Sequence, residues 1–231
     1  MILFLYGEDN FRLKQKVKQL KEKFISASLG DTNLAVLDGG TMVFNDIARQ
    51  ILAMPFLSRK RLVIIENLLK KGKKETQEKM GEFLKKIPEE AVVAFIEEGV
   101  PDRRTALFKK LVQAKQVAEY KLLEPEALRR WIKKEVASRG GEIETEATSK
   151  LAEYVGPDLW RMKNEIDKLV LYERKITSEN IELFVAKEVQ ANIFKLIEET
   201  AVKNPQKAIY ELYQLFKDNQ AEIYILTMIV Y

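Results

Sequence analysis

The sequence contains no cysteine and no histidine, and these two absences exclude several classes of site. Disulfide bonds, thiol nucleophiles, zinc sites built on Cys and His, and Ser-His-Asp triads each need one of these residues. Catalysis by this chain would have to use carboxylates, lysine, tyrosine, hydroxyl groups or a bound cation. The two absences therefore favour binding or structural work over enzymatic chemistry.

Glycine, proline and long apolar runs are also scarce. The chain has 10 Gly and 6 Pro in 231 residues, too few for a linker-rich or low-complexity protein. No stretch reaches the roughly 18 uncharged apolar residues of a membrane helix, so no membrane partner is expected. Residues 1–10 lack the basic region and cleavage site of a signal peptide, which predicts a cytoplasmic location.

Short apolar runs alternate with amphipathic segments in the first half of the chain. The pattern predicts strands at residues 2–6, 34–37, 61–65, 91–96 and 117–120. It predicts helices between them at residues 11–25, 44–54, 76–87 and 105–114. Such an alternation is typical of a mostly parallel sheet covered on both faces.

The pattern changes near Glu124 and Pro125, after which no strand-like run is predicted. The remaining periodic segments predict helices at residues 126–139, 145–155, 157–172, 178–186, 193–203, 205–217 and 220–231. The fold class is therefore α/β plus all-α. The last predicted helix ends the sequence inside the apolar stretch 224–231. We therefore expect either that the C-terminus is truncated or that helices from elsewhere cover this stretch.

Charge is distributed unevenly between these two parts. Residues 1–122 carry 23 Lys and Arg against 16 Asp and Glu, whereas residues 123–231 carry 16 against 19. A basic first part suits an ordinary solvated surface, but also a nucleic acid or an acidic partner. The richest run, at residues 70–74, is predicted to be a loop and has no interleaved aromatic residues for stacking on bases.

The turn after the first predicted strand is where parallel α/β folds commonly hold phosphate groups. Here the turn, residues 6–11, has a single glycine and none of the glycine spacings of a phosphate-binding loop. Glu8 and Asp9 would repel a phosphate. No nucleotide and no other cofactor or metal is therefore expected at this turn.

Two carboxylates at predicted strand ends keep an enzymatic alternative open. Glu66 and Glu97 follow the third and fourth strands and could hold Mg²⁺ in a divergent ATPase. The simpler interpretation is that both are solvated carboxylates at the start of loops.

Residues 52–59 join a helix to a strand, where polar residues are the usual connection. This segment instead contains Met54, Pro55, Phe56 and Leu57. Pro55 forces the residue before it out of helical conformation and should end the helix. Either Phe56 or Leu57 fills the core, or the pair is presented to a pocket on a partner.

These features together resemble the family of delta subunits of the bacterial DNA polymerase III clamp loader. The resemblance runs in order along essentially the whole chain. It rests on residues 5–9 with Phe11, residues 54–63, residues 102–105 with Leu107, Trp131-Ile132, residues 156–159, residues 164–169 and residues 191–194.

The resemblance implies an AAA+-like α/β domain at residues 1–122, a helical lid domain at 123–187 and a partial helical collar at 188–231. It implies a subunit that is not an enzyme: it binds the ring-shaped sliding clamp and opens one interface, while other subunits hydrolyse ATP. The implied partners are the sliding clamp, the ATPase subunits and delta-prime, with a DNA contact in the assembled loader. The implied clamp-binding residues are Met54, Pro55, Phe56 and Leu57.

Three functions remain to be distinguished at this point. The first is the clamp-opening subunit, in which Arg59, Lys60 and Arg61 could also meet an acidic clamp surface. The second is the divergent ATPase that uses Glu66 or Glu97. The third is a nucleic-acid-binding module that uses the basic first domain, and it predicts DNA affinity with a steep salt dependence.

Overall fold

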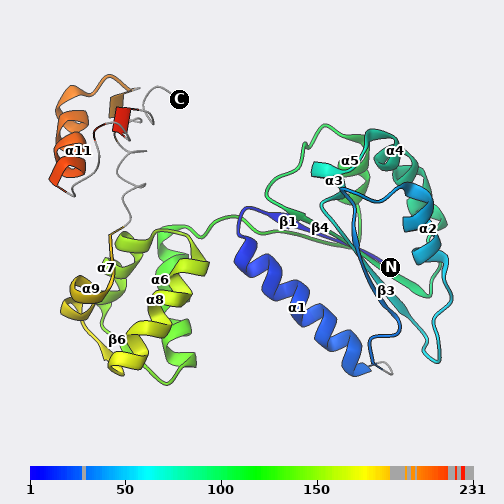
Figure 1. Cartoon of the computed structure of the whole chain (residues 1–231), viewed down its shortest axis with the longest axis horizontal. Coiled ribbons are helices and arrows are strands. Elements are labelled where there is room, and N and C mark those ends of the chain that lie inside the picture. Colours follow the sequence, from blue (N-terminus) through cyan, green and yellow to red (C-terminus); the bar gives the residue numbers. More distant parts are fainter. Residues whose placement is uncertain are drawn as a thin grey trace. The chain divides into compact units, whose positions relative to one another are not determined.

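The computed structural model describes residues 1–27, 30–187, 196, 199–200, 202–217, 222 and 225–226. The chain divides into two compact units, Met1–Leu122 and Leu123–Tyr231 (Figure 1). The predicted helices at residues 193–203 and 220–231, and with them much of the proposed collar, lie largely outside the described residues. The division into three domains stays a prediction.

The first unit is built on a parallel sheet of five strands in the order β2-β3-β4-β1-β5. In sequence order the strands are β1 (Ile2–Gly7), β2 (Leu34–Asp38), β3 (Arg61–Glu66), β4 (Ala91–Glu98) and β5 (Gln116–Glu119). The three inner strands, β3, β4 and β1, read as continuous apolar runs, and their central residues are buried. Burial on both faces explains why these strands lack the alternation of a half-exposed sheet.

Helices cover both faces of this sheet (Figure 1). The helix α1 (Asn10–Ala27) packs Leu13 and Val17 against one face, beside Leu3 and Leu5. The other face carries a larger core around Phe4 and Phe95. Its helices are α2 (Phe44–Leu52), α3 (Leu68–Lys71), α4 (Lys74–Phe83), the 3-10 turn η1 (Leu84–Lys86) and α5 (Ala106–Leu111). The α/β prediction for this unit is confirmed.

Residues 70–74 are not the loop that their charge predicted. Lys70 and Lys71 end the short helix α3, and Lys74 begins α4, so only Gly72 and Lys73 connect the two helices. The buried residues Leu68 and Leu69 hold α3 against the core. Tertiary packing therefore makes this segment helical, and its run of charged residues gives no sign of that helix.

The second unit is mainly helical. The helices among its described residues are α6 (Pro125–Ser138), α7 (Thr145–Val155), α8 (Leu159–Tyr172), α9 (Ser178–Phe184) and α11 (Pro205–Lys217). Asp158 caps α8 by accepting the amide hydrogens of Trp160 and Arg161. Thr177 and Asn180 form a reciprocal capping box at the start of α9.

The prediction that no strand follows residue 124 is wrong. β6 (Glu142–Ile143) and β7 (Lys175–Ile176) form a two-stranded parallel sheet. Each strand has two residues, which is too short to produce a periodic pattern. Among the described residues, no helix has both the length and the apolar character needed to cross a membrane.

Candidate functional site

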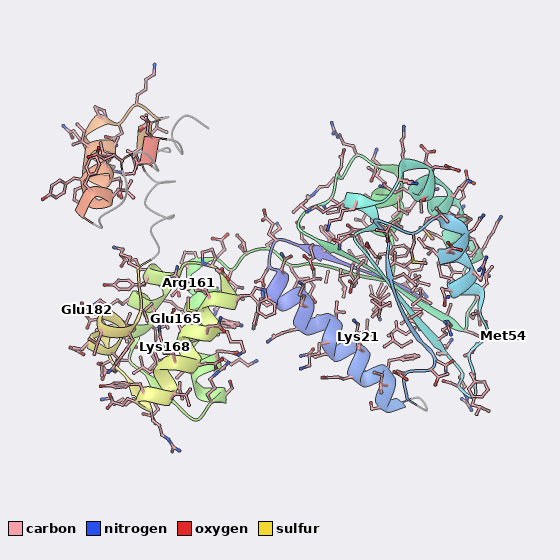
Figure 2. The ribbon with its side chains drawn as sticks, in the orientation of Figure 1. Lys21, Met54, Arg161, Glu165, Lys168 and Glu182 are labelled. Atoms are coloured by element: carbon pink, nitrogen blue, oxygen red, sulfur yellow. The ribbon has the colours of Figure 1, made fainter. Side chains whose placement is uncertain are left out.

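The segment that joins α2 to β3 is a short exposed loop, which we call the apolar loop and define as residues 53–60. Helix α2 ends at Leu52, two residues earlier than predicted, because Ala53 already has extended backbone angles of −62° and 130°. Since β3 begins at Arg61, the loop lies at the amino edge of the sheet. Figure 2 shows Met54 at the periphery of the first unit.

Three apolar side chains of this loop face solvent. Met54 is 89% exposed, Phe56 63% and Leu57 72%, while Pro55 is half-buried. The alternative in which Phe56 or Leu57 fills the core is therefore wrong. Adjacent, solvent-exposed side chains of this size form an apolar patch of the kind that marks protein-binding surfaces.

The backbone of the loop is held from outside by Asn33. The amide hydrogen of Phe56 is donated to Asn33 Oδ1 at 2.7 Å, and Asn33 Nδ2 donates to the Phe56 carbonyl at 2.8 Å. Asn33 itself is 1% exposed. Both main-chain groups of the central aromatic residue are thus satisfied by one buried side chain.

A second connection fastens the end of α2 to the start of β3. Arg61 Nε donates to the Gln50 carbonyl at 3.0 Å, and an Arg61 terminal nitrogen donates to Gln50 Oε1 at 2.8 Å. Lys60 Nζ donates to the Glu89 carbonyl. Of the three basic residues expected to meet an acidic partner, Arg61 is occupied inside the unit, and Arg59 is exposed on the loop itself.

Leu57 has a left-handed backbone conformation, with φ at +49°. A residue with a Cβ atom pays roughly 1–2 kcal/mol for this region, and strained backbone is commonly found at functional sites. The left-handed turn comes directly after the residue that Asn33 holds. Both residues at this turn, Phe56 and Leu57, face solvent.

The turn between β1 and α1 has the opposite character. The Asp9 carboxylate accepts the Arg12 amide hydrogen at 2.9 Å and forms an ion pair with Arg12 Nε at 2.6 Å. Arg12 in turn donates to the Lys121 carbonyl. Asp9 therefore occupies the start of α1, where an anion would bind in a phosphate-binding fold.

Glu97 is buried as well, contrary to the expectation of a solvated carboxylate. It accepts the amide hydrogens of Leu69 at 2.7 Å and Lys70 at 3.2 Å, and so holds α3 against β4. Burial raises the pKa of Glu97 to about 7, although these hydrogen bonds act to lower it. Within the described part of the chain, no three acidic side chains come together as a metal site would require.

A cavity of about 350 Å³ lies between α1 and the ends of β3 and β4. Lys14, Lys18 and Lys21 line one side of it, and Glu66 and Glu98 line the other. Lys14 pairs with Glu98 at 3.0 Å, so part of its charge is compensated within the cavity. Glu66 ends β3, and Glu97 is the last residue but one of the neighbouring strand β4. Glu97 is hydrogen-bonded to α3, whereas Glu66 lines this cavity.

Comparison with known proteins identifies the family. The sequence model of the family described as DNA polymerase III, delta subunit matches residues 3–121, just over half of the chain. This chain belongs to the DNA polymerase III delta subunit family. A curated delta subunit of DNA polymerase III, from Bacillus subtilis (strain 168), is 25% identical over 241 residues, which cover 97% of this chain and 68% of the relative.

Solved structures show the same fold as this delta-family chain. The Bacillus subtilis clamp loader delta protein has a TM-score of 0.57 and 23% identity, over 99% of this chain and 70% of that one. Thermotoga maritima RuvB, a Holliday junction branch migration motor, has a TM-score of 0.55 and 13% identity, over 86% of this chain and 69% of its own. The AAA+-like fold is therefore confirmed.

Asn33 and Gln50 are the residues of this site that sequence reasoning missed. Asn33 bonds to the main chain of Phe56, 23 residues later, and Gln50 accepts from the Arg61 side chain, 11 residues later. Neither residue belongs to a recognisable motif. The predicted residues Met54, Pro55, Phe56 and Leu57 lie together on the apolar loop. Residues 191–194, which contributed to the family resemblance, lie outside the described residues.

Proposed function

We propose that this chain is a clamp-loader delta subunit that binds the sliding clamp through Met54, Pro55, Phe56 and Leu57. The observation that carries the proposal is the exposure of three large apolar side chains on a loop whose backbone is fixed. Membership of the delta-subunit family supplies the partner. The role is non-catalytic, with ATP hydrolysed by the ATPase subunits of the same loader.

The size of the apolar patch suits an anchoring contact. Transferring a side chain such as Phe56 or Leu57 from water into a dry pocket contributes about 1.5–3 kcal/mol. Two such residues are enough to dominate an interface whose rim is polar. Opening the ring further requires that the chain bind the open clamp more tightly than the closed clamp.

The test is clamp binding by the full chain, measured by surface plasmon resonance. The variant Phe56→Ala/Leu57→Ala should weaken binding by at least about 100-fold, as expected when about 3 kcal/mol of burial is lost. A matched control is Leu171→Ala/Tyr172→Ala, which removes an adjacent pair that is 87% and 60% exposed on α8. Circular dichroism checks that both variants fold.

Ring opening needs a second measurement. A fluorescence pair placed across one clamp interface should separate when the wild-type chain is added, and stay together with the loop variant. Equal affinity of the wild type and the loop variant for the clamp would overturn the proposed site. Failure of the folded wild type to bind any clamp would overturn the function itself.

The charge of the first unit favours DNA as a second ligand in the loader. Residues 1–122 carry seven more basic than acidic residues, as 23 against 16, while residues 123–231 carry an acidic excess. Binding that depends on phosphate contacts loses affinity steeply as salt increases. Titration of the chain with primed DNA at several salt concentrations tests this contact separately from clamp binding.

A further inference from the structure

We propose that Asn33 is the positioning residue of the clamp-binding loop, fixing the direction in which Phe56 and Leu57 are presented. The inference rests on the proposed function for its partner, but not for its geometry. Asn33 lies 23 residues before Phe56, immediately ahead of β2. Its side-chain amide contacts the loop, and its main-chain carbonyl contacts the start of β3.

Asn33 holds the loop at two places. Its side-chain amide exchanges two hydrogen bonds with the main chain of Phe56, at 2.7 and 2.8 Å. Its main-chain carbonyl accepts the amide hydrogen of Leu62, in β3, at 2.8 Å. One residue therefore holds both Phe56 and Leu62, which flank segment 57–61, and so restrains the two ends of that segment.

The chemistry of this arrangement is specific to an amide. Phe56 offers one donor and one acceptor on its backbone, and only a side chain with both an acceptor and a donor satisfies the two at once. At 1% exposure, Asn33 has no water to replace a lost partner. Removing the amide leaves unpaired polar groups, which favours a loop that moves away to find solvent.

The left-handed conformation of Leu57 depends on this restraint. A leucine at φ +49° relaxes to an ordinary backbone conformation unless its neighbours hold it. Phe56, held by Asn33, is the neighbour on one side, and Arg61, held by Gln50, is close on the other. Release of Phe56 would let the two apolar side chains turn toward each other or toward the unit.

A fixed loop matters for binding because ordering a mobile loop costs free energy when the partner docks. We therefore expect Asn33→Ala to weaken clamp binding by roughly 10-fold while Phe56 and Leu57 remain intact. Asn33→Asp keeps the acceptor for the Phe56 amide hydrogen and loses the donor, so its effect should be intermediate or, where the buried charge adds to the loss, equal to that of Asn33→Ala.

The first experiment measures how readily a protease cleaves the loop in the absence of the clamp. The full chain is treated with chymotrypsin under native conditions, and the fragments cut after Phe56 or Leu57 are quantified by mass spectrometry. Asn33→Ala should increase cleavage at these two bonds at least 10-fold. Val63→Ala, which removes volume at a fully buried position of β3, is the control for a general loss of stability in the same unit.

A measurement of clamp binding then separates a role of Asn33 in positioning the loop from a role in stability. Asn33→Ala should weaken binding in the wild-type background and add nothing in the Phe56→Ala/Leu57→Ala background, since the residues it positions are absent. An additive loss in both backgrounds would overturn the positioning role, as would unchanged cleavage after Phe56 and Leu57. If the Phe56→Ala/Leu57→Ala variant bound the clamp as tightly as the wild type, the proposed clamp site would be wrong. The cleavage experiment would still decide whether Asn33 restrains the loop.

Discussion

At the carboxyl edge of the parallel sheet, Asp9 and Glu97 are buried and bonded to backbone amides of the same unit, whereas at the amino edge Met54, Phe56 and Leu57 are left in solvent. The first edge is where related folds bind phosphates, and here its amides are occupied by the chain's own carboxylates. The second edge is a position that loops usually fill with polar residues. The proposed function thus places recognition at the amino edge, opposite the edge where related folds bind phosphates.

The largest expected effect is a loss of stability from a substitution at Gly7, on the carboxyl edge of the sheet. This residue has φ at +144°, and a Cβ atom placed there would lie 2.2 Å from the Tyr120 carbonyl oxygen. Gly7→Ala should therefore lower the free energy of unfolding by at least about 3 kcal/mol, measured by urea denaturation. Gly30→Ala, at φ +85° but with no atom within 4 Å, should cost only about 1 kcal/mol.

A comparable cost for Gly7→Ala and Gly30→Ala would contradict this difference. It would mean that backbone conformation alone, and not the close contact between Gly7 and Tyr120, closes the turn between β1 and α1.

The next effect concerns how the free energy of unfolding depends on pH through Glu97, on the same carboxyl edge. Burial raises the pKa of Glu97 to about 7, from an ordinary value of 4.5, so the folded chain holds this proton more tightly than the unfolded chain. The contribution of Glu97 to stability therefore falls as pH rises from about 4.5 to about 7, by up to about 3 kcal/mol. Glu97→Gln should remove this slope from a plot of unfolding free energy against pH.

Glu98→Gln is the matched control, because the Glu98 side chain is 41% exposed and paired with Lys14. The slope between pH 4.5 and 7 should survive this change. Parallel curves for the wild type and Glu97→Gln would show that Glu97 does not titrate in that interval.

The smallest expected effect on stability comes from a substitution in the apolar loop, at the amino edge of the sheet. Leu57→Asn keeps a residue that tolerates the left-handed region and removes the apolar side chain. We expect the free energy of unfolding to rise by about 0.5–1 kcal/mol as strain is relieved, while clamp affinity falls. Thermal denaturation with surface plasmon resonance checks both, and a variant that lost stability and affinity together would argue against stored strain.

Much of the fold could be predicted from the sequence, because the strands are apolar runs separated by amphipathic helices. All five strands of the sheet were placed to within about two residues, and α7 and α11 were placed at the bounds they have. The failures have a common physical cause. α3 and the β6–β7 pair are too short for periodicity and exist only through contacts with distant residues.

The candidate site was predictable in its apolar residues but not in its support. Met54, Phe56 and Leu57 stand out because apolar residues are unusual between a helix and a strand. The loop is supported by the hydrogen bonds between Asn33 and Phe56 and by the left-handed backbone of Leu57, and neither feature leaves a local signal in the sequence. Glu97 shows the reverse case, in which a carboxylate that looked solvated is buried because α3 packs over it.

The strand order has a consequence for how the chain is made. β1 is synthesised before the other four strands of its sheet, yet its two neighbours in the sheet are β4 and β5, with Leu3 opposite Gln116 in register. At a synthesis rate of about 5–20 residues per second, the apolar strand around Phe4 waits roughly 5–20 s for its second partner. During that interval the nascent chain exposes one of its three inner strands. Chaperones that bind nascent chains, and the speed of translation, should therefore influence the yield of folded protein more than they would for a sheet built from hairpins.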